Sequence, residues 1–254
     1  MRLLALLALV SMAVPQMVSA QTDEIQVYDG GLTARGTFNL TLHNNFTPEG
    51  RTTAFAGALL ADKSLNGVPE WAYGVTTWFE AGLYLPLYSI GKRAGHSSAM
   101  LNGVKLRLLF AVPHADDRRF FYGVNLEFSY NAKHWDPTRF TSEIRPIIGW
   151  RLPPVDLIVN PIFDTSYGGL ENLDLAPATR VAGDLSRTWK LAIEEYDDFG
   201  PLHQFHAGNQ QVHQLYGIVD HTIRALQIEA GAGFGLTSAS DRITLKLILS
   251  RDLN

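Results

Sequence analysis

The sequence predicts an all-β protein: a single antiparallel β-barrel of about 12 strands that spans an outer membrane, after a cleaved signal peptide. Three observations predict it. The chain begins with an export signal, its polarity then alternates with a period of two in about a dozen short segments, and no apolar run reaches the roughly 18 residues of a membrane helix. Because lipid cannot pair with backbone polar groups, only helices and closed barrels cross it, and here a barrel is favoured.

The export signal occupies residues 1–20. Arg2 supplies a positive n-region, residues 3–14 form a short apolar core, and Val18-Ser19-Ala20 is a small-x-small cleavage site before Gln21. The apolar core is too short for a membrane-spanning helix. We therefore predict a signal peptide over residues 1–20 and one barrel domain over residues 21–254.

Residues 122–130 show the alternation most clearly. The odd positions carry glycine, asparagine, glutamate and serine, whereas the even positions carry tyrosine, valine, leucine and phenylalanine. Successive side chains of a strand point to opposite faces, so this segment has one polar and one apolar face. In a membrane barrel the apolar face would contact lipid and the polar face would line the interior.

Composition limits the alternatives. After removal of the signal peptide the chain keeps 20 Lys and Arg against 25 Asp and Glu, with no basic tract, which argues against nucleic acid as a partner. The absence of cysteine excludes disulfide bonds as the source of stability in an exported protein. About 230 mature residues suffice for a dozen strands of about 9–11 membrane residues each, with loops.

Alternation and turn residues place twelve strands. The predicted ranges are 38–45, a strand ending near 73, 79–87, 101–112, 122–130, 140–151, 155–167, 179–185, a strand around 189–193, 211–219, 226–234 and 243–249. Short connections at 76–77, 113–117, 152–154, 186–188 and 220–222 fall on one side of this barrel. The connections 46–66, 89–98, 131–139, 168–176 and 198–210 fall on the other and are mostly longer, with a short exception at 236–241. Short periplasmic turns and longer outer loops are typical of outer-membrane barrels.

Aromatic residues indicate two girdles. Trp150 and Trp189 stand in the apolar register beside short connections, and Tyr130, Phe140 and Tyr167 stand in it at the opposite ends. Tyrosine and tryptophan favour the level of the lipid headgroups, where their apolar rings and polar tips both find partners. The alternative is that large aromatic residues simply favour strands.

The polar register contains ten charged candidates for the lining of the lumen, five of each sign. Equal numbers predict a mutually neutralising network in a tight or partly occluded lumen, because an unpaired buried charge is costly. Twelve strands lie between eight-stranded barrels, which side chains fill, and porins, which hold an open channel. The number of strands therefore does not distinguish an open lumen from a closed one. The ten residues are Glu80, Lys105, Arg107, Glu127, Glu143, Arg145, Lys190, Glu194, Glu229 and Lys246.

Catalytic, metal and cofactor sites find only weak support, and we expect no enzyme and no cofactor. His96 beside Ser97 and Ser98, or the aspartates 197 and 198 with the nearby histidines, offer nucleophile and base types without a motif that fixes their spacing. The weak candidates for a metal site are His203, His206 and His213. Residues 231–235 are rich in glycine but precede no helix, so we interpret them as glycines that leave room inside a strand.

Three strings resemble a known family. EWAYGVTTWFEAGLYLPLY at 70–88, IEEYDDFGPL at 193–202 and GAGFGLTSASDRITLKLILS at 231–250 are similar to outer-membrane barrels grouped as "MetA-pathway of phenol degradation" proteins, often described as transporters. In that family a strand ending Tyr-Gly-Val/Leu-Thr turns directly into an apolar strand, and Gly-Leu-Thr-x-x-Ser-Asp opens the last one. The resemblance implies an outer-membrane barrel that passes small hydrophobic or aromatic compounds, and it carries over no site residue.

We therefore expect an outer-membrane barrel of a Gram-negative bacterium that lets small molecules pass. Its expected partners are outer-membrane lipid, the barrel-assembly machinery and a small-molecule substrate. Two alternatives remain open. One is an occluded barrel with a structural or recognition role and no transport. The other is a soluble periplasmic β-barrel or sandwich that binds a ligand and buries its apolar register.

Overall fold

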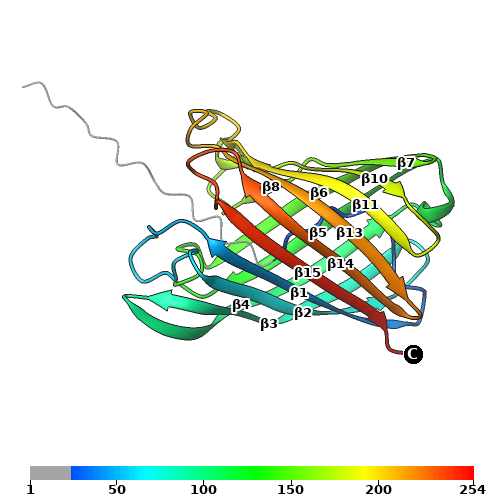
Figure 1. Ribbon diagram of the computed structural model, residues 1–254, viewed down its shortest axis with the longest axis horizontal. Helices are drawn as coiled ribbons and strands as arrows, with labels where there is room; N and C mark the ends of the chain where they lie inside the picture. Colours follow the sequence, from blue (N-terminus) through cyan, green and yellow to red (C-terminus); the bar gives the residue numbers. More distant parts are fainter. Residues whose placement is uncertain (1–23) are drawn as a thin grey trace, which may run out of the picture.

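A computed structural model describes residues 24–254 as a closed barrel of twelve antiparallel strands (Figure 1). The predicted signal peptide, residues 1–20, lies outside the described residues. Each strand pairs with its neighbours in the ring, and the first strand pairs with the last, so the sheet has no free edge around the barrel. In ring order the strands are β1 (Phe38–Glu49), β2 (Ser64–Gly74), β3 (Phe79–Arg93), β4 (His96–Ala111), β5 (Phe120–Asn131), β6 (Phe140–Leu152), β7 (Val155–Asn160), β10 (Ala178–Asp184), β11 (Trp189–Asp198), β13 (Val212–Ile223), β14 (Leu226–Gly235) and β15 (Ile243–Asp252).

The described residues hold little structure outside these twelve strands. Three short strands extend the wall at one end: β8 (Phe163–Thr165) pairs with the beginning of β6, and β9 (Asp174–Leu175) joins β8 to β12 (Gly200–Pro201). Two single-turn 3₁₀ helices, η1 (Ala115–Asp117) and η2 (Leu170–Asn172), lie in connections. No helix in this part of the chain has the length and apolarity to cross a membrane.

The two ends of the barrel differ in their connections. At the turn end the connections are residues 75–78, 112–119, 153–154, 185–188 and 224–225, and the two ends of the ring, Asn39 and Asp252, pair there as well. At the loop end they are residues 50–63, 94–95, 132–139, 161–177, 199–211 and 236–242. The predicted asymmetry and the number of strands are confirmed.

Four details of the predicted strands were wrong. Residues 220–222 belong to β13, where Asp220 pairs with Glu229, and the turn lies at 224–225. The connection predicted at 89–98 is only residues 94–95, because β3 and β4 continue to a tight turn in which both residues have positive φ. The range 155–167 is two strands, since Pro161 interrupts the ladder between β7 and β8. The first strand continues to Glu49 and shortens the loop after it.

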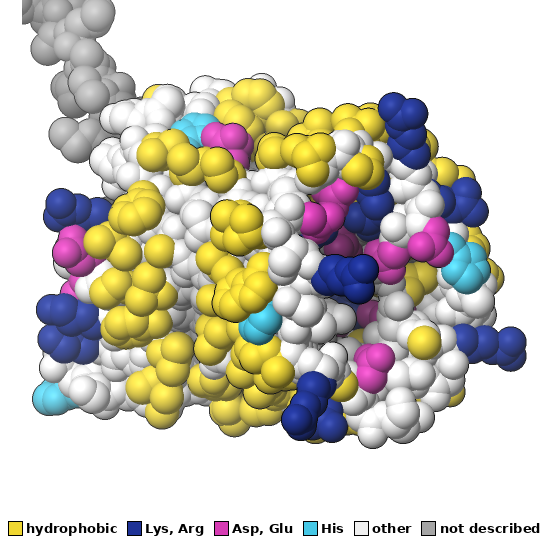
Figure 2. All heavy atoms as spheres, turned by 45° about the vertical axis from the view of Figure 1, so that its right-hand side comes forward, with side chains coloured by type: hydrophobic (Ala, Val, Ile, Leu, Met, Phe, Trp, Pro, Cys, Tyr) yellow, Lys and Arg dark blue, Asp and Glu magenta, His cyan; other side chains and the backbone are white. Residues whose placement is uncertain are grey.

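The outer surface carries the apolar register. Trp150 and Trp189 are exposed at the turn end, and Tyr130, Phe140 and Tyr167 are exposed at the loop end, as predicted. Between these ends the strands expose mainly leucine, isoleucine, valine and phenylalanine (Figure 2). In water such a surface would be strongly unfavourable, and its extent is that of a lipid-facing belt.

A register shift brings an additional apolar side chain inward. Between Tyr84 and Leu87 the pairing of β3 with β4 slips, and Pro86, which has no N–H to give to the ladder, stands in the slip. Tyr84 and Leu87 are three positions apart yet both are completely buried, together with Val68 of β2. The slip therefore turns Leu87 inward, next to Tyr84, which already shares the inner register of Glu80.

Candidate functional site

The N-terminal segment before β1 lies inside the barrel. We call residues 24–34 the strap. Its side chains Glu24, Ile25, Val27 and Tyr28 are all at least nine-tenths buried, although no layer of structure covers the barrel from outside. The chain leaves the interior at the turn end, where Arg35 bridges Gly74, and then begins β1. These side chains are therefore buried against the inner wall of the barrel.

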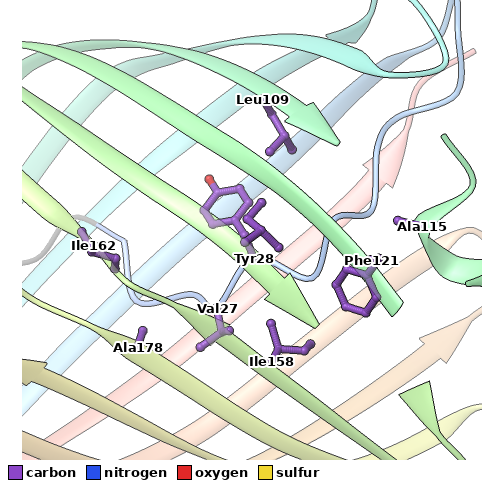
Figure 3. Packing of buried hydrophobic residues seen from close by; sticks show 9 residues of the cluster. Val27, Tyr28, Leu109, Ala115, Phe121, Ile158, Ile162 and Ala178 are labelled. Carbon is purple, nitrogen blue, oxygen red and sulfur yellow. The ribbon is translucent and has the colours of Figure 1, made fainter. Parts of the chain in front are cut away.

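Apolar side chains on the inner wall receive the strap. Val27 and Tyr28 pack in one cluster with residues of β4, β5, β6, β7 and β10, with η1 and with the connection after β7 (Figure 3): Leu109, Phe121, Ile147, Ile158, Ala178, Ala115 and Ile162. Ile25 packs in a second cluster, with Ala182, Ala192, Tyr216 and Ile218 of β10, β11 and β13. A water-filled lumen would favour polar side chains at these positions. The strap supplies the apolar contact that the inner wall requires.

Polar groups of the wall fix the backbone of the strap. Asn160 of β7 is fully buried and pairs with Tyr28 twice: the Tyr28 N–H donates to Oδ1 at 2.7 Å, and Nδ2 donates to the Tyr28 carbonyl at 3.0 Å. Arg145 donates to the carbonyl of Gln26 at 2.8 Å, and Lys246 donates to that of Ile25 at 3.1 Å. Buried backbone groups need such partners, so these side chains replace the β-ladder that the strap lacks.

The strap reaches opposite walls of the barrel. Its Ile25 side chain packs with Ala192 of β11, whereas the Tyr28 hydroxyl hydrogen bonds at 2.7 Å to Tyr84 on β3, six strands away in the ring. Towards the turn end, the Thr33 N–H donates to Glu80 of β3 at 2.5 Å. Residues 24–28 thus cross the lumen and have contacts on nine of the twelve strands.

The ten charged candidates from the sequence all stand on the inner register. Seven are at least nine-tenths buried, and Glu143, Lys190 and Glu229 are partly buried. They join into ion pairs across strands, among them Lys105 with Glu127 at 2.7 Å. Lys246 contacts Glu194 at 2.5 Å and Glu229 at 2.6 Å. Charged groups held in this way rigidify the interior, since each would be costly to bury alone.

Several charged members of the network escaped the sequence analysis. Arg180 of β10 bridges Glu194, Asp220 and Glu229, and Glu70 of β2 pairs with Arg107. Glu24 of the strap stands 3.7 Å from Arg145. Arg180 belonged to a segment with weak alternation, and Asp220 was assigned to a turn. A count of charges at every second position through 178–184 and 212–223 would have found both.

The apolar inner residues were missed as well, although the sequence carries a sign of them. Most of them have an apolar neighbour in the sequence that faces outward, as in Phe120-Phe121 and Ile147-Ile148, so two consecutive strand positions are apolar. A strand that is apolar on both faces at one level is covered on both faces there.

The candidate histidines have separate partners. His203 bonds to the carbonyl of Glu171, and His213 contacts Asp197 at 2.5 Å and Gln211 at 3.1 Å. No group of three or more His, Cys, Asp or Glu side chains in residues 24–254 has the geometry to hold a metal ion. His96, Ser97 and Ser98 begin β4 at the loop end, where they pair with the end of β3.

The interpretation of residues 231–235 as glycines that leave room is confirmed. A Cβ at Gly233 would overlap the ring of Tyr216, and one at Gly231 would overlap Ile218. Gly149 of β6 has the same role for Phe121. Large inner side chains thus lie flat across glycines of the neighbouring strand, which lets the strap fit between them.

A cavity of 590 Å³ lies between the strap and the turn end. Its lining comes from the strap, from the strands and from the turns, and includes Thr41, Arg107, Ile158, Arg180 and Ser250. On the long strands β1, β4, β13 and β15 its lining residues all lie in the half nearer the turn end. Figure 2 shows the hollow at this end, with acidic side chains in and around it. The cavity is therefore a vestibule that opens at the turn end and is bounded by the strap.

One carboxyl group at the rim of this vestibule has a shifted pKa. Asp116 lies in η1, outside the strands. Its side chain is largely exposed, but lost hydration at the rim, and secondarily the negative charge of Asp29 in the strap, raise the pKa of Asp116, while Arg151 at 3.1 Å opposes the rise.

Known proteins with this fold are outer-membrane barrels. The crystal structure of the COG4313 outer membrane channel from Pseudomonas putida F1 superimposes with a TM-score of 0.60 at 13% sequence identity, over 91% of this chain and 100% of that one. The NanC porin gives a TM-score of 0.52 at 6% identity, over 85% and 99%. No protein family and no curated protein sequence matches the chain. The fold is that of an outer-membrane β-barrel.

Proposed function

We propose that this protein is a non-enzymatic channel for small molecules in the outer membrane of a Gram-negative bacterium, with the turn end in the periplasm. The carrying observation is the vestibule of 590 Å³ inside a closed barrel whose outer surface is apolar. The similarity to two channel-type barrels supports the same proposal. Outer-membrane lipid and the barrel-assembly machinery are the partners that such a barrel requires.

Passage requires movement of the strap. Residues 24–28 touch opposite walls, so a solute that enters the vestibule meets them before it reaches the loop end. The strap is held by side-chain hydrogen bonds and packing rather than by a β-ladder, which makes it the part of the interior that can move while the wall stays paired.

The vestibule favours a polar cargo. Charged and hydroxyl side chains outnumber apolar ones in its lining, which also includes Leu109, Ile158, Trp189 and Ile248. The family resemblance implies hydrophobic or aromatic compounds instead. Flux of glucose compared with flux of phenol separates these two substrate classes.

The test is solute flux into liposomes that contain the purified protein. We expect the wild type to pass small sugars and a variant lacking residues 24–34 to pass them faster. Electrophoresis with and without boiling shows that each protein is a folded barrel. If neither folded protein carries solute faster than protein-free liposomes, the channel proposal is wrong.

The same experiment addresses a second candidate, a barrel with a structural or recognition role. Two observations favour it: the strap crosses the lumen, and buried ion pairs such as Arg107–Glu80 and Lys246–Glu194 brace the wall. This role predicts no flux from the wild type even when the strap-deleted variant conducts.

A further inference from the structure

Carboxylates encircle the vestibule near the turn end. Its lining contains nine acidic and five basic side chains, an excess of four carboxylates. The acidic residues come from elements all around the barrel, from β15 through β13, β10 and β7 to η1, the strap and β2 and β3. They are Asp29, Glu70, Glu80, Asp116, Asp156, Asp184, Asp220, Glu229 and Asp252.

The cations of the lining do not cancel this charge. Arg180 is shared by Asp220 and Glu229, and Arg151 lies 3.1 Å from Asp116 and 3.3 Å from Asp156. The same sharing occurs at the other two inner cations: Arg107 pairs with Glu70 and Glu80, and Lys190 with Asp156 and Asp184. Because each of these cations serves two or more carboxylates, the wall keeps a net negative charge.

Some of these carboxylates have capacity left for a ligand. Asp29 accepts only the N–H of Gly31, and Asp252 accepts only the Asn39 amide, with no cation of residues 24–254 within ion-pair distance of either. One buried oxygen of Asp220, Oδ1, accepts no hydrogen bond, and Asp220 lines the vestibule. Unmet acceptors inside a cavity are satisfied by a donor or a cation that enters it.

We propose that the vestibule binds small cations and excludes small anions, so that passage through this barrel is cation-selective. A cleft lined by one sign of charge between low-dielectric walls concentrates counter-ions, and rings of Asp and Glu are the usual basis of cation selectivity in pores. The size of the vestibule suits small organic ammonium compounds as well as hydrated metal ions. The selectivity rests on the proposed channel function, whereas the preference of the vestibule for cations does not.

The first test uses the protein in planar bilayers under a potassium chloride gradient. We expect wild-type protein to admit potassium at least about threefold faster than chloride. Asp29→Asn with Asp252→Asn keeps the acceptor geometry, removes two charges and brings the ratio towards one. The control Glu171→Gln with Glu195→Gln removes two charges near the loop end and leaves the ratio unchanged. A wild-type ratio of one or below overturns the selectivity.

The second test needs no conduction and so separates this inference from the channel proposal. The chain contains no cysteine, so Gln227→Cys places a single thiol in the vestibule, and Gln204→Cys places one on the loop end. We measure how fast a cationic and an anionic methanethiosulfonate of similar size react with each.

For each thiol we take the ratio of its reaction rate with the cationic reagent to that with the anionic one. We expect this ratio to be about tenfold higher for Gln227→Cys than for Gln204→Cys and to fall with added salt. The Asp29→Asn, Asp252→Asn background reduces it. Equal ratios at the two positions would show that the vestibule does not select cations, whether or not the barrel conducts. Absence of conduction together with a high ratio would reject the channel and leave the cation site.

Discussion

The bond between Asn160 and the strap offers the sharpest test of how the lumen is occupied. Replacing Asn160 by alanine removes both hydrogen bonds to Tyr28, of 2.7 and 3.0 Å, and leaves the barrel strands otherwise intact. Each bond contributes about 0.5–1.5 kcal/mol net, and a buried backbone group without a partner costs about 1–3 kcal/mol. We expect the substitution to weaken docking of the strap by about 2–4 kcal/mol.

The assay is alkylation of a single thiol introduced by Val27→Cys. Val27 is 5% exposed, and the chain has no other cysteine, so the thiol reacts with a maleimide only when the strap leaves the wall. A loss of 2–4 kcal/mol raises the open population, and with it the alkylation rate, about 30- to 1,000-fold. The matched control is Asn131→Ala, because Asn131 is equally buried but bonds only to loop-end residues 138 and 141.

An unchanged rate in the Asn160→Ala protein would refute the reasoning. It would mean that the strap is held by its apolar contacts alone, or that it does not lie against β7. An equal acceleration by Asn131→Ala would point instead to general loosening of the barrel.

Three further predictions concern the wall itself. Gly149→Ala should lower the free energy of unfolding by about 1–3 kcal/mol, because the added Cβ would overlap the ring of Phe121. The control is Gly217→Ala, whose Cβ would meet no atom within 4 Å and should leave the free energy unchanged. Urea titration in detergent compares the two variants, and equal midpoints would contradict this packing. Lys246→Met leaves buried Glu194 and partly buried Glu229 with Arg180 as their remaining cation and should cost up to about 3–5 kcal/mol in the same titration; a cost below 1 kcal/mol would show that the Lys246 ion pairs are not needed. Leu247→Arg puts a charge on the outer face in the middle of β15 and should destabilise the protein in lipid vesicles by about 2–4 kcal/mol, an effect that would be absent if this face did not contact lipid.

The wall was predictable from the sequence because lipid imposes a simple pattern on it. Residues 122–130 alternate strictly, since one face must be apolar along the whole membrane thickness, and this rule holds for strands such as β5 and β15. The same rule placed all ten charged candidates on the inner register. Strand ends were less predictable: β13 runs through Asp220 because its partner Glu229 continues the ladder, which no local turn signal shows.

The interior was not predictable to the same degree. The strap has no periodicity of its own, and its conformation is set by groups far away in sequence, such as Asn160 and Lys246. An aromatic residue such as Phe121 is typical of a strand on either face, so the sequence alone does not show that its side chain points inward and is buried there. The sequence therefore predicted a charged interior and left its main occupant, the chain's own N-terminal segment, undetected.

The place of the strap in the chain has a consequence for the order of assembly. Ile25 precedes every strand in the sequence, yet it packs on β10, β11 and β13 and is bound by Lys246 of β15, the last strand to be made. Because Tyr28 binds Tyr84 of β3, the complete docking site of the strap forms only when β1 has closed the ring with β15. The earliest part of the barrel domain to be synthesised must wait for the latest, and contacts across more than 200 residues form slowly. Protection of the strap would thus mark the completed barrel and would distinguish it from a nearly closed one.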